Sequence, residues 1–186
     1  MTDVRFPEIP REKMSAEQIA IYDRIASGPR AGVRGPYNAL LRAPELCGLS
    51  EQLGAYVRYR NSLPNRLKEM AILLTARHWT AQYEWYAHRK IGEQEGLSPT
   101  LCDTIARGER PGNMDDEQVV VFDFVSQMLK THAVDDTIYA QMKQAFGERG
   151  VLDLIYLVGH YCTVAFILNI DRHPLPPDAK PLPELG

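Results

Sequence analysis

The stretch from Leu63 to His88, LPNRLKEMAILLTARHWTAQYEWYAH, shows helical periodicity in both of its halves. Pro64 can open the first helix, because a proline fits the first helical turn, and the apolar residues after it recur at helical spacing. This helix is expected to end near His78. Thr80 suits the N-cap of a second helix that continues to Glu95. The stretch therefore predicts two consecutive helices.

Helix signals continue on both sides of this stretch. Ser15 and Gln18 have the spacing of a capping box, Pro99 suits a first helical position and Asp135 suits an N-cap. A last helix is expected over about 151–170. Because strand-like alternation is scarce and no internal repeat is visible, we predict an all-α fold with a single domain.

The chain is expected to have three parts. Residues 1–34 form an N-terminal helical extension, residues 35–172 form the main helical domain, and residues 173–186 form a proline-rich tail. The prolines favour an extended tail. Such a tail is either a free end, the more common case, or an arm that lies over a neighbouring subunit.

Composition bounds the class of protein. The chain has 186 residues and a formal net charge of -3, which argues against a non-specific nucleic-acid binder. Its three cysteines, Cys47, Cys102 and Cys162, have no Cys-x-x-Cys spacing. This count argues against a disulfide scaffold or a cysteine-rich zinc site and favours the reducing cytoplasm.

No membrane association is expected. The segment from Met1 to Met14 lacks the apolar run of a signal peptide. The segment from Leu154 to Leu168 has no Asp, Glu, Lys or Arg, but it is shorter than the roughly 20 residues of a membrane span. We therefore interpret it as a buried core helix.

The densest cluster of polar and aromatic residues includes Glu84 and His88. These residues are four apart, so on a helix they share one face. A carboxylate beside an imidazole can fix the imidazole tautomer, and such a pair can transfer protons. An ordinary solvated ion pair has the same spacing. Because both tryptophans, Trp79 and Trp85, lie in the same cluster, we favour a functional site there.

His160 is the second candidate, because it lies in the middle of the most apolar predicted helix, where a polar group needs a partner. A satisfied core histidine is the alternative interpretation. A metal site made of Glu84, His88 and His160 is a minor alternative, since the spacing differs from the Glu-x-x-His of di-iron bundles. We therefore do not expect a metal there.

The cluster resembles the carboxymuconolactone decarboxylase family, which shares its fold with the alkylhydroperoxidase D proteins. The resemblance covers about residues 35–177. The matching segments are Gly35–Leu41, Leu63–Glu69, Ala76–Arg77, Tyr83–His88, Glu95–Ser98, Leu168–Asn169 and Pro174–Pro176. It implies an alkylhydroperoxidase D-like helical bundle and a homo-oligomer, a trimer or a hexamer.

The thiols of the peroxidase branch are missing. That branch has a Glu, two cysteines and a His, and here Glu69 and His88 match the first and the last. Ala81 and Glu84 stand where the two cysteines would be. Because thiol–disulfide exchange needs both thiols, the resemblance does not extend to peroxidase activity.

The resemblance then implies a decarboxylase-type lyase that works without a metal or organic cofactor and acts on a small carboxylated lactone or related unsaturated acid. We predict His88 as the acid–base group and Glu84 as its orienting or second proton-transfer group, with His160 polarising the lactone oxygen. The predicted substrate-binding residues are Tyr37, Arg66, Arg77, Trp85 and Tyr161. An isomerase or hydrolase for another small cyclic substrate, and a non-catalytic oligomeric binding module, are the alternatives.

Overall fold

A computed structural model describes residues 4–28 and 32–184. Pieces of the predicted N-terminal extension and tail (residues 1–3, 29–31 and 185–186) lie outside the described residues. The described part is all-helical and compact, which confirms the prediction of an all-α protein. The eight α-helices are α1 (Ala16–Ser27), α2 (Pro36–Leu40), α3 (Pro44–Ala55), α4 (Asn65–His78), α5 (Gln82–Gln94), α6 (Pro99–Ala106), α7 (Asp116–Thr131) and α8 (Asp136–Asp171).

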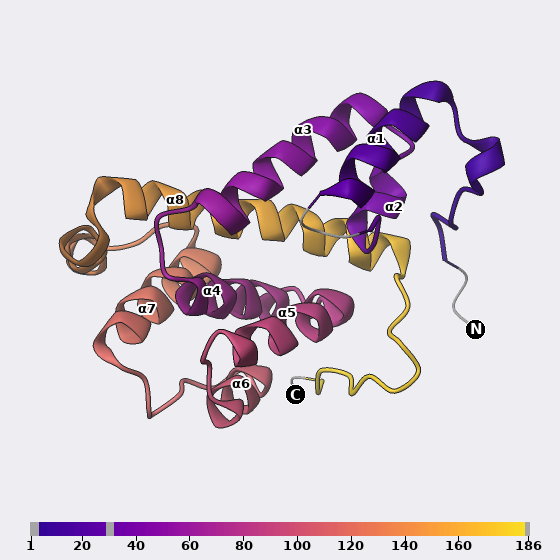
Figure 1. Ribbon diagram of the computed structural model, residues 1–186. Helices are drawn as coiled ribbons and strands as arrows, with labels where there is room; N and C mark the ends of the chain where they lie inside the picture. Colours follow the sequence, from indigo (N-terminus) through magenta and orange to yellow (C-terminus); the bar gives the residue numbers. More distant parts are fainter. Residues whose placement is uncertain (1–3, 29–31, 185–186) are drawn as a thin grey trace.

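The long helix α8 runs through the middle of the molecule, with α1–α3 on one side and α4–α7 on the other (Figure 1). Two short helices complete the arrangement: a 3₁₀-helix at Arg11–Lys13, and a π-helix at Tyr56–Arg60 that continues directly from α3. The main core forms where α4 packs against α5, α7 and α8. Every residue of α4 from Leu67 to Arg77 is buried, so α4 is the central element of this core.

Most predicted helix starts are confirmed. Ser15 and Gln18 form a complete capping box, Pro99 is the first residue of α6, and the Asp135 side chain accepts a hydrogen bond from the Ile138 amide. The two helices expected between Asp135 and Ile170 form one element with a kink at Gly147, where φ is 69°. Glycine adopts this left-handed conformation without a Cβ clash.

The predicted N-cap at Thr80 is wrong. The N-cap of α5 is Ala81, which offers no side-chain hydrogen bond, and Thr80 has φ of 49°. The Thr80 hydroxyl instead accepts a hydrogen bond from the Arg77 guanidinium at 2.9 Å. Thr80 therefore lies in the turn before the N-cap, with a left-handed backbone that differs from the extended conformation of N-cap residues.

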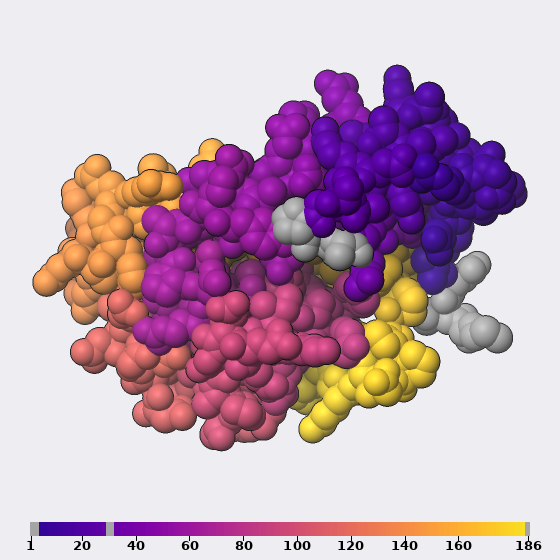
Figure 2. Space-filling view, in the orientation of Figure 1, coloured from indigo at the N-terminus to yellow at the C-terminus, as the bar shows by residue number. Residues whose placement is uncertain are grey.

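The C-terminal tail is extended, as predicted, but the described part is not a loosely held end. After α8 ends, the tail turns back and lies against the region of α5 and α6 (Figures 1 and 2). Leu182 is buried in the main core, and its backbone amide donates to the Gln82 side chain at 2.7 Å. The Pro183 carbonyl accepts from Arg77 at 2.7 Å. The tail is therefore part of the folded unit.

Helix α8 combines membrane-like composition with a packed position. By length and composition alone it is apolar enough to cross a membrane, yet half of its most apolar window is buried inside the molecule. Its inner side packs on α4 and α7. The expected core role therefore holds for one side of α8, and its other side is exposed.

Candidate functional site

The candidate site is centred on His88, whose partner is Glu69. The His88 Nδ1 atom lies 2.7 Å from Glu69 Oε2, and both side chains are about nine-tenths buried. The two residues lie on α5 and α4. Gly92, one turn after His88, allows this close packing, because a Cβ there would meet Leu97 at 2.9 Å and Glu69 at 3.5 Å. Since a carboxylate only accepts hydrogen bonds, Nδ1 carries the proton and Nε2 is left to act on a ligand.

The predicted pairing of Glu84 with His88 is wrong. Both Glu84 carboxyl oxygens are buried without a hydrogen-bond partner among the described residues. The i,i+4 spacing puts the two residues on one face of α5, but the neighbouring helix α4 supplies the partner of His88. Burial raises the pKa of Glu84 well above its ordinary value, which favours the neutral acid.

A cavity of about 390 Å³ opens over His88. Four of the eight predicted site residues line it: His88, His160, Tyr37 and Tyr161. The His88 and Tyr161 rings meet edge to face, with centroids 4.9 Å apart, and Tyr161 contacts His160 in the same way at 5.4 Å. The structure therefore brings together residues from α2, α5 and α8 that are far apart in the sequence.

Gly35 closes one edge of this cavity. It has φ of 58° and immediately precedes α2, which carries Tyr37. A Cβ at this position would lie 3.1 Å from the Tyr83 ring. Both the left-handed backbone and the close contact favour glycine, so this position fixes how α2 approaches α5.

Arg58 is the functional candidate that the sequence analysis missed. It lies in the π-helix after α3 and lines the His88 cavity, as does Arg34. The Lys68 ammonium donates to the Arg58 carbonyl at 2.8 Å and so ties this turn to α4. The guanidinium stacks over Tyr59, 5.3 Å from the ring centroid. No hydrogen bond joins this guanidinium to another described residue, so it can receive an anion.

The electrostatic setting keeps Arg58 charged. Burial alone would lower the pKa of Arg58, but Tyr161, Tyr59 and Glu69 raise it, and the net shift is upward. In the sequence, the alternation of aromatic and basic residues over Tyr56–Arg60 was the one feature that could have indicated an anion-binding role for Arg58. Short π-helical segments are frequent at functional sites, but the sequence did not reveal this one.

The other predicted substrate-binding residues lie away from this cavity. Arg66 is on the surface and pairs with Asp115 and Glu117. Arg77 is buried, where its guanidinium donates to the carbonyls of Ala106 and Pro183. Neither arginine pairs with Glu69, whose carboxylate contacts His88. We therefore assign Arg66 and Arg77 structural roles.

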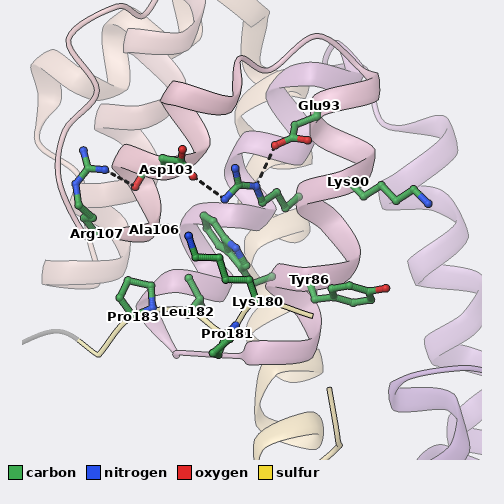
Figure 3. A pocket seen from close by; sticks show the side chains of 12 residues that line it. Tyr86, Lys90, Glu93, Asp103, Ala106, Arg107, Lys180, Pro181, Leu182 and Pro183 are labelled. Atoms are coloured by element: carbon green, nitrogen blue, oxygen red, sulfur yellow. Dashed lines mark hydrogen bonds and ion pairs between the residues drawn. The ribbon is translucent and has the colours of Figure 1, made fainter. Parts of the chain in front are cut away.

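Trp85 lines a different and larger cavity of about 740 Å³, between α5, α6 and the tail. Figure 3 shows Lys180, Pro181, Leu182 and Pro183 forming one of its walls. Several of its charged residues are already paired: Arg89 contacts both Glu93 and Asp103, and Arg107 contacts Glu109. Because no histidine or cysteine lines it, this cavity offers no acid–base pair comparable to that of Glu69 and His88.

The cysteines have no evident role at the site. Cys47 and Cys102 are buried, and burial raises the pKa of each thiol to about 11. The sulfur of Cys162 accepts a hydrogen bond from the Trp79 indole at 3.2 Å. Among residues 4–28 and 32–184, no group of three or more His, Cys, Asp or Glu side chains could hold a metal ion.

Neither a protein-family model nor a curated protein matches this chain. The class of protein is therefore described by its fold and site alone. It is an all-helical protein in which a buried carboxylate–histidine pair adjoins a cavity lined by tyrosines and arginines.

Proposed function

We propose that this protein is a cofactor-independent lyase of the carboxymuconolactone decarboxylase type, with an alkylhydroperoxidase D-like fold, that acts on a small carboxylated lactone or related unsaturated acid. The observation that carries the proposal is the Glu69–His88 pair beside a cavity that also holds Arg58. A single histidine oriented by a carboxylate can transfer a proton, and a guanidinium can hold an anionic substrate.

The proposed reaction needs no oxidant or reductant. The bond between the lactone ring and its carboxylate breaks, and CO2 leaves. The electron pair delocalises into the conjugated lactone carbonyl as an enolate. His88, as imidazolium, donates a proton from Nε2 to carbon and is then neutral, and it regains a proton from solvent before the next turnover. Glu69 holds the ring at Nδ1 throughout, as carboxylates do in other histidine-based sites.

The other cavity residues have supporting roles in this proposal. Arg58 stabilises the negative charge on the substrate oxygens, where a positioned cation is most effective. His160 donates a hydrogen bond to the lactone oxygen. Tyr37 and Tyr161 form the walls that orient the ring. A cavity of about 390 Å³ suits a small ligand.

The direct test is to incubate the purified protein with carboxymuconolactone in D2O and to measure CO2 and deuterium in the product. We expect CO2 release with one deuterium incorporated at carbon. Deuterium exchange without CO2 release would instead indicate a proton-transfer isomerase. Binding without either reaction, across a panel of small unsaturated lactones and acids, would indicate a non-catalytic binding module.

Arg58→Gln is expected to raise KM for the anionic substrate about 10- to 100-fold, because a hydrogen bond to a charged group contributes roughly 1.5–3 kcal/mol. Steady-state CO2 release measures this effect. Arg66→Gln is the matched control, since Arg66 is paired on the surface away from the cavity. Equal KM values for the two variants would remove Arg58 from the binding site.

A further inference from the structure

Helices α3 and α8 present a largely apolar stripe on the outside of the molecule. On α3, Leu46, Leu49 and Leu53 are three and four residues apart and therefore share one face. Large exposed side chains on α8 recur with the same helical spacing. The stripe consists of Leu46, Leu49, Leu53, Leu152, Ile155, Tyr156, Phe166 and Ile170, which are between 39% and 60% exposed.

A groove of about 490 Å³ lies between the two helices within this stripe. Leucines of α3 form one wall, and Ile155 and Tyr156 of α8 form the other. Gly159 lies in the groove, and a Cβ added there would meet no atom within 4 Å. The groove therefore has room for a side chain from outside.

The stripe is poor in charge. From Val151 to Ile170, α8 carries one charged residue, Asp153, which is buried and accepts hydrogen bonds from Tyr56 and Ser62. The only charged residues of α3 are Glu45 and Glu51. Depletion of charge is typical of the core of a protein–protein interface. A lipid surface would be favoured by basic residues, which this part of α3 and α8 lacks.

The size of the stripe also matches a protein interface. Eight large side chains, each more than a third exposed, lie on it, and a standard interface buries roughly 800 Å² on each partner. A helix that is apolar on all sides is normally buried. Residues 151–170 of α8 meet that description. Within one chain, however, only the side of α8 that packs on α4 and α7 is covered.

We propose that a second copy of this chain docks on the α3–α8 stripe, face to face. The contact is self-complementary, because each copy offers both the leucine ridge of α3 and the groove beside it, as a two-fold contact requires. This inference is independent of the proposed function, since it concerns a surface outside the Glu69–His88 pair.

The proposed contact adjoins the candidate site. His160 lines both the α3–α8 groove and the His88 cavity. A second copy seated in the groove would cover the outer side of His160 and exclude water from that wall of the cavity. Assembly would thereby complete the site.

Sedimentation equilibrium of the full chain over 1–100 μM tests the contact. We expect the wild type to associate and Gly159→Glu to raise the dissociation constant at least about 100-fold, because the interface would bury an unpaired carboxylate. The variant should keep the monomer fold, since a Cβ at 159 meets nothing and glutamate favours a helix more than glycine does. Gly112→Glu is the matched control, in open space within the loop before α7.

A second readout is the melting temperature, which should rise with concentration for the wild type and Gly112→Glu but not for Gly159→Glu. A wild type that is monomeric at 100 μM would overturn the proposal. An assembly that Gly159→Glu leaves unchanged would do the same, by placing the contact on another face. Binding of the monomer to phosphatidylcholine–phosphatidylglycerol vesicles, abolished by Gly159→Glu, would assign the stripe to a membrane instead.

Discussion

His88→Ala is expected to lower kcat for CO2 release about 10²- to 10⁴-fold, the usual contribution of a positioned acid–base group. In the proposed reaction His88 delivers the proton, because Glu69 orients its ring at the edge of the cavity. The effect should appear in kcat rather than in KM, since Arg58 and the cavity walls remain to bind the substrate. His78→Ala, which changes an exposed histidine outside the cavity, is the control.

The carboxylate that supports His88 can be identified with two isosteric variants. Glu69→Gln should lower kcat by about 10-fold or more, because an amide cannot hold Nδ1–H in the same way. Glu84→Gln should leave kcat near the wild-type value, since neither Glu84 oxygen contacts His88. Circular dichroism and melting temperatures should show that both variants are folded. The reverse pattern, a loss with Glu84→Gln alone, would contradict the assigned pair.

Glu84→Gln is expected to stabilise the protein at neutral pH, increasingly so as the pH rises. Unfolded Glu84 titrates near 4.5, whereas burial raises its pKa in the folded protein well above that value. Between these two pKa values the folded state holds one proton more than the unfolded state, so the free energy of unfolding falls as the pH increases. This loss amounts to as much as about 1.4 kcal/mol per pH unit. The glutamine variant does not titrate and should escape it.

Urea denaturation of both proteins from pH 4 to pH 8 measures this effect. At pH 4 the acid and the amide are both neutral, so the two free energies of unfolding should lie within about 1 kcal/mol of each other. As the pH rises, the free energy of unfolding of Glu84→Gln should increasingly exceed that of the wild type. Glu95→Gln, at an exposed position, should follow the wild type. A Glu84→Gln variant that becomes less stable than the wild type as the pH rises would show that the carboxylate is paired in solution.

Much of the helical fold was predictable because its signals are local. Ser15 with Gln18 and Asp135 with the Ile138 amide are caps whose partners lie three residues away. Thr80 failed as a predicted cap because it lies in a left-handed turn before the N-cap, where its hydroxyl accepts from Arg77, a residue that also donates to the distant carbonyl of Pro183. The packing of Leu182 into the core is also a long-range contact, which composition alone does not indicate.

The site was predicted only in part, because some of its residues stand out locally and others are brought in by packing between helices. His88 and His160 stood out as polar residues on apolar or aromatic helices, and the structure places both at one cavity. The spacing of Glu84 on the same helix was misleading, because the partner of His88 comes from α4. Glu69 was matched through the family resemblance, but its contact with His88 depends on how closely two helices pack. Arg58 was missed because a π-helix directs it into the cavity.

The most direct test of the central claim, that Glu69 orients His88 for proton transfer, is the ¹⁵N NMR spectrum of the His88 ring in the selectively labelled protein. The structure predicts that neutral His88 carries its proton on Nδ1, held by Glu69, and that Nε2 shifts when a small carboxylate ligand binds. Glu69→Gln should shift the tautomer populations, whereas Glu84→Gln should leave them unchanged. A proton found on Nε2 in the wild type, with Nδ1 unprotonated, would contradict the assignment.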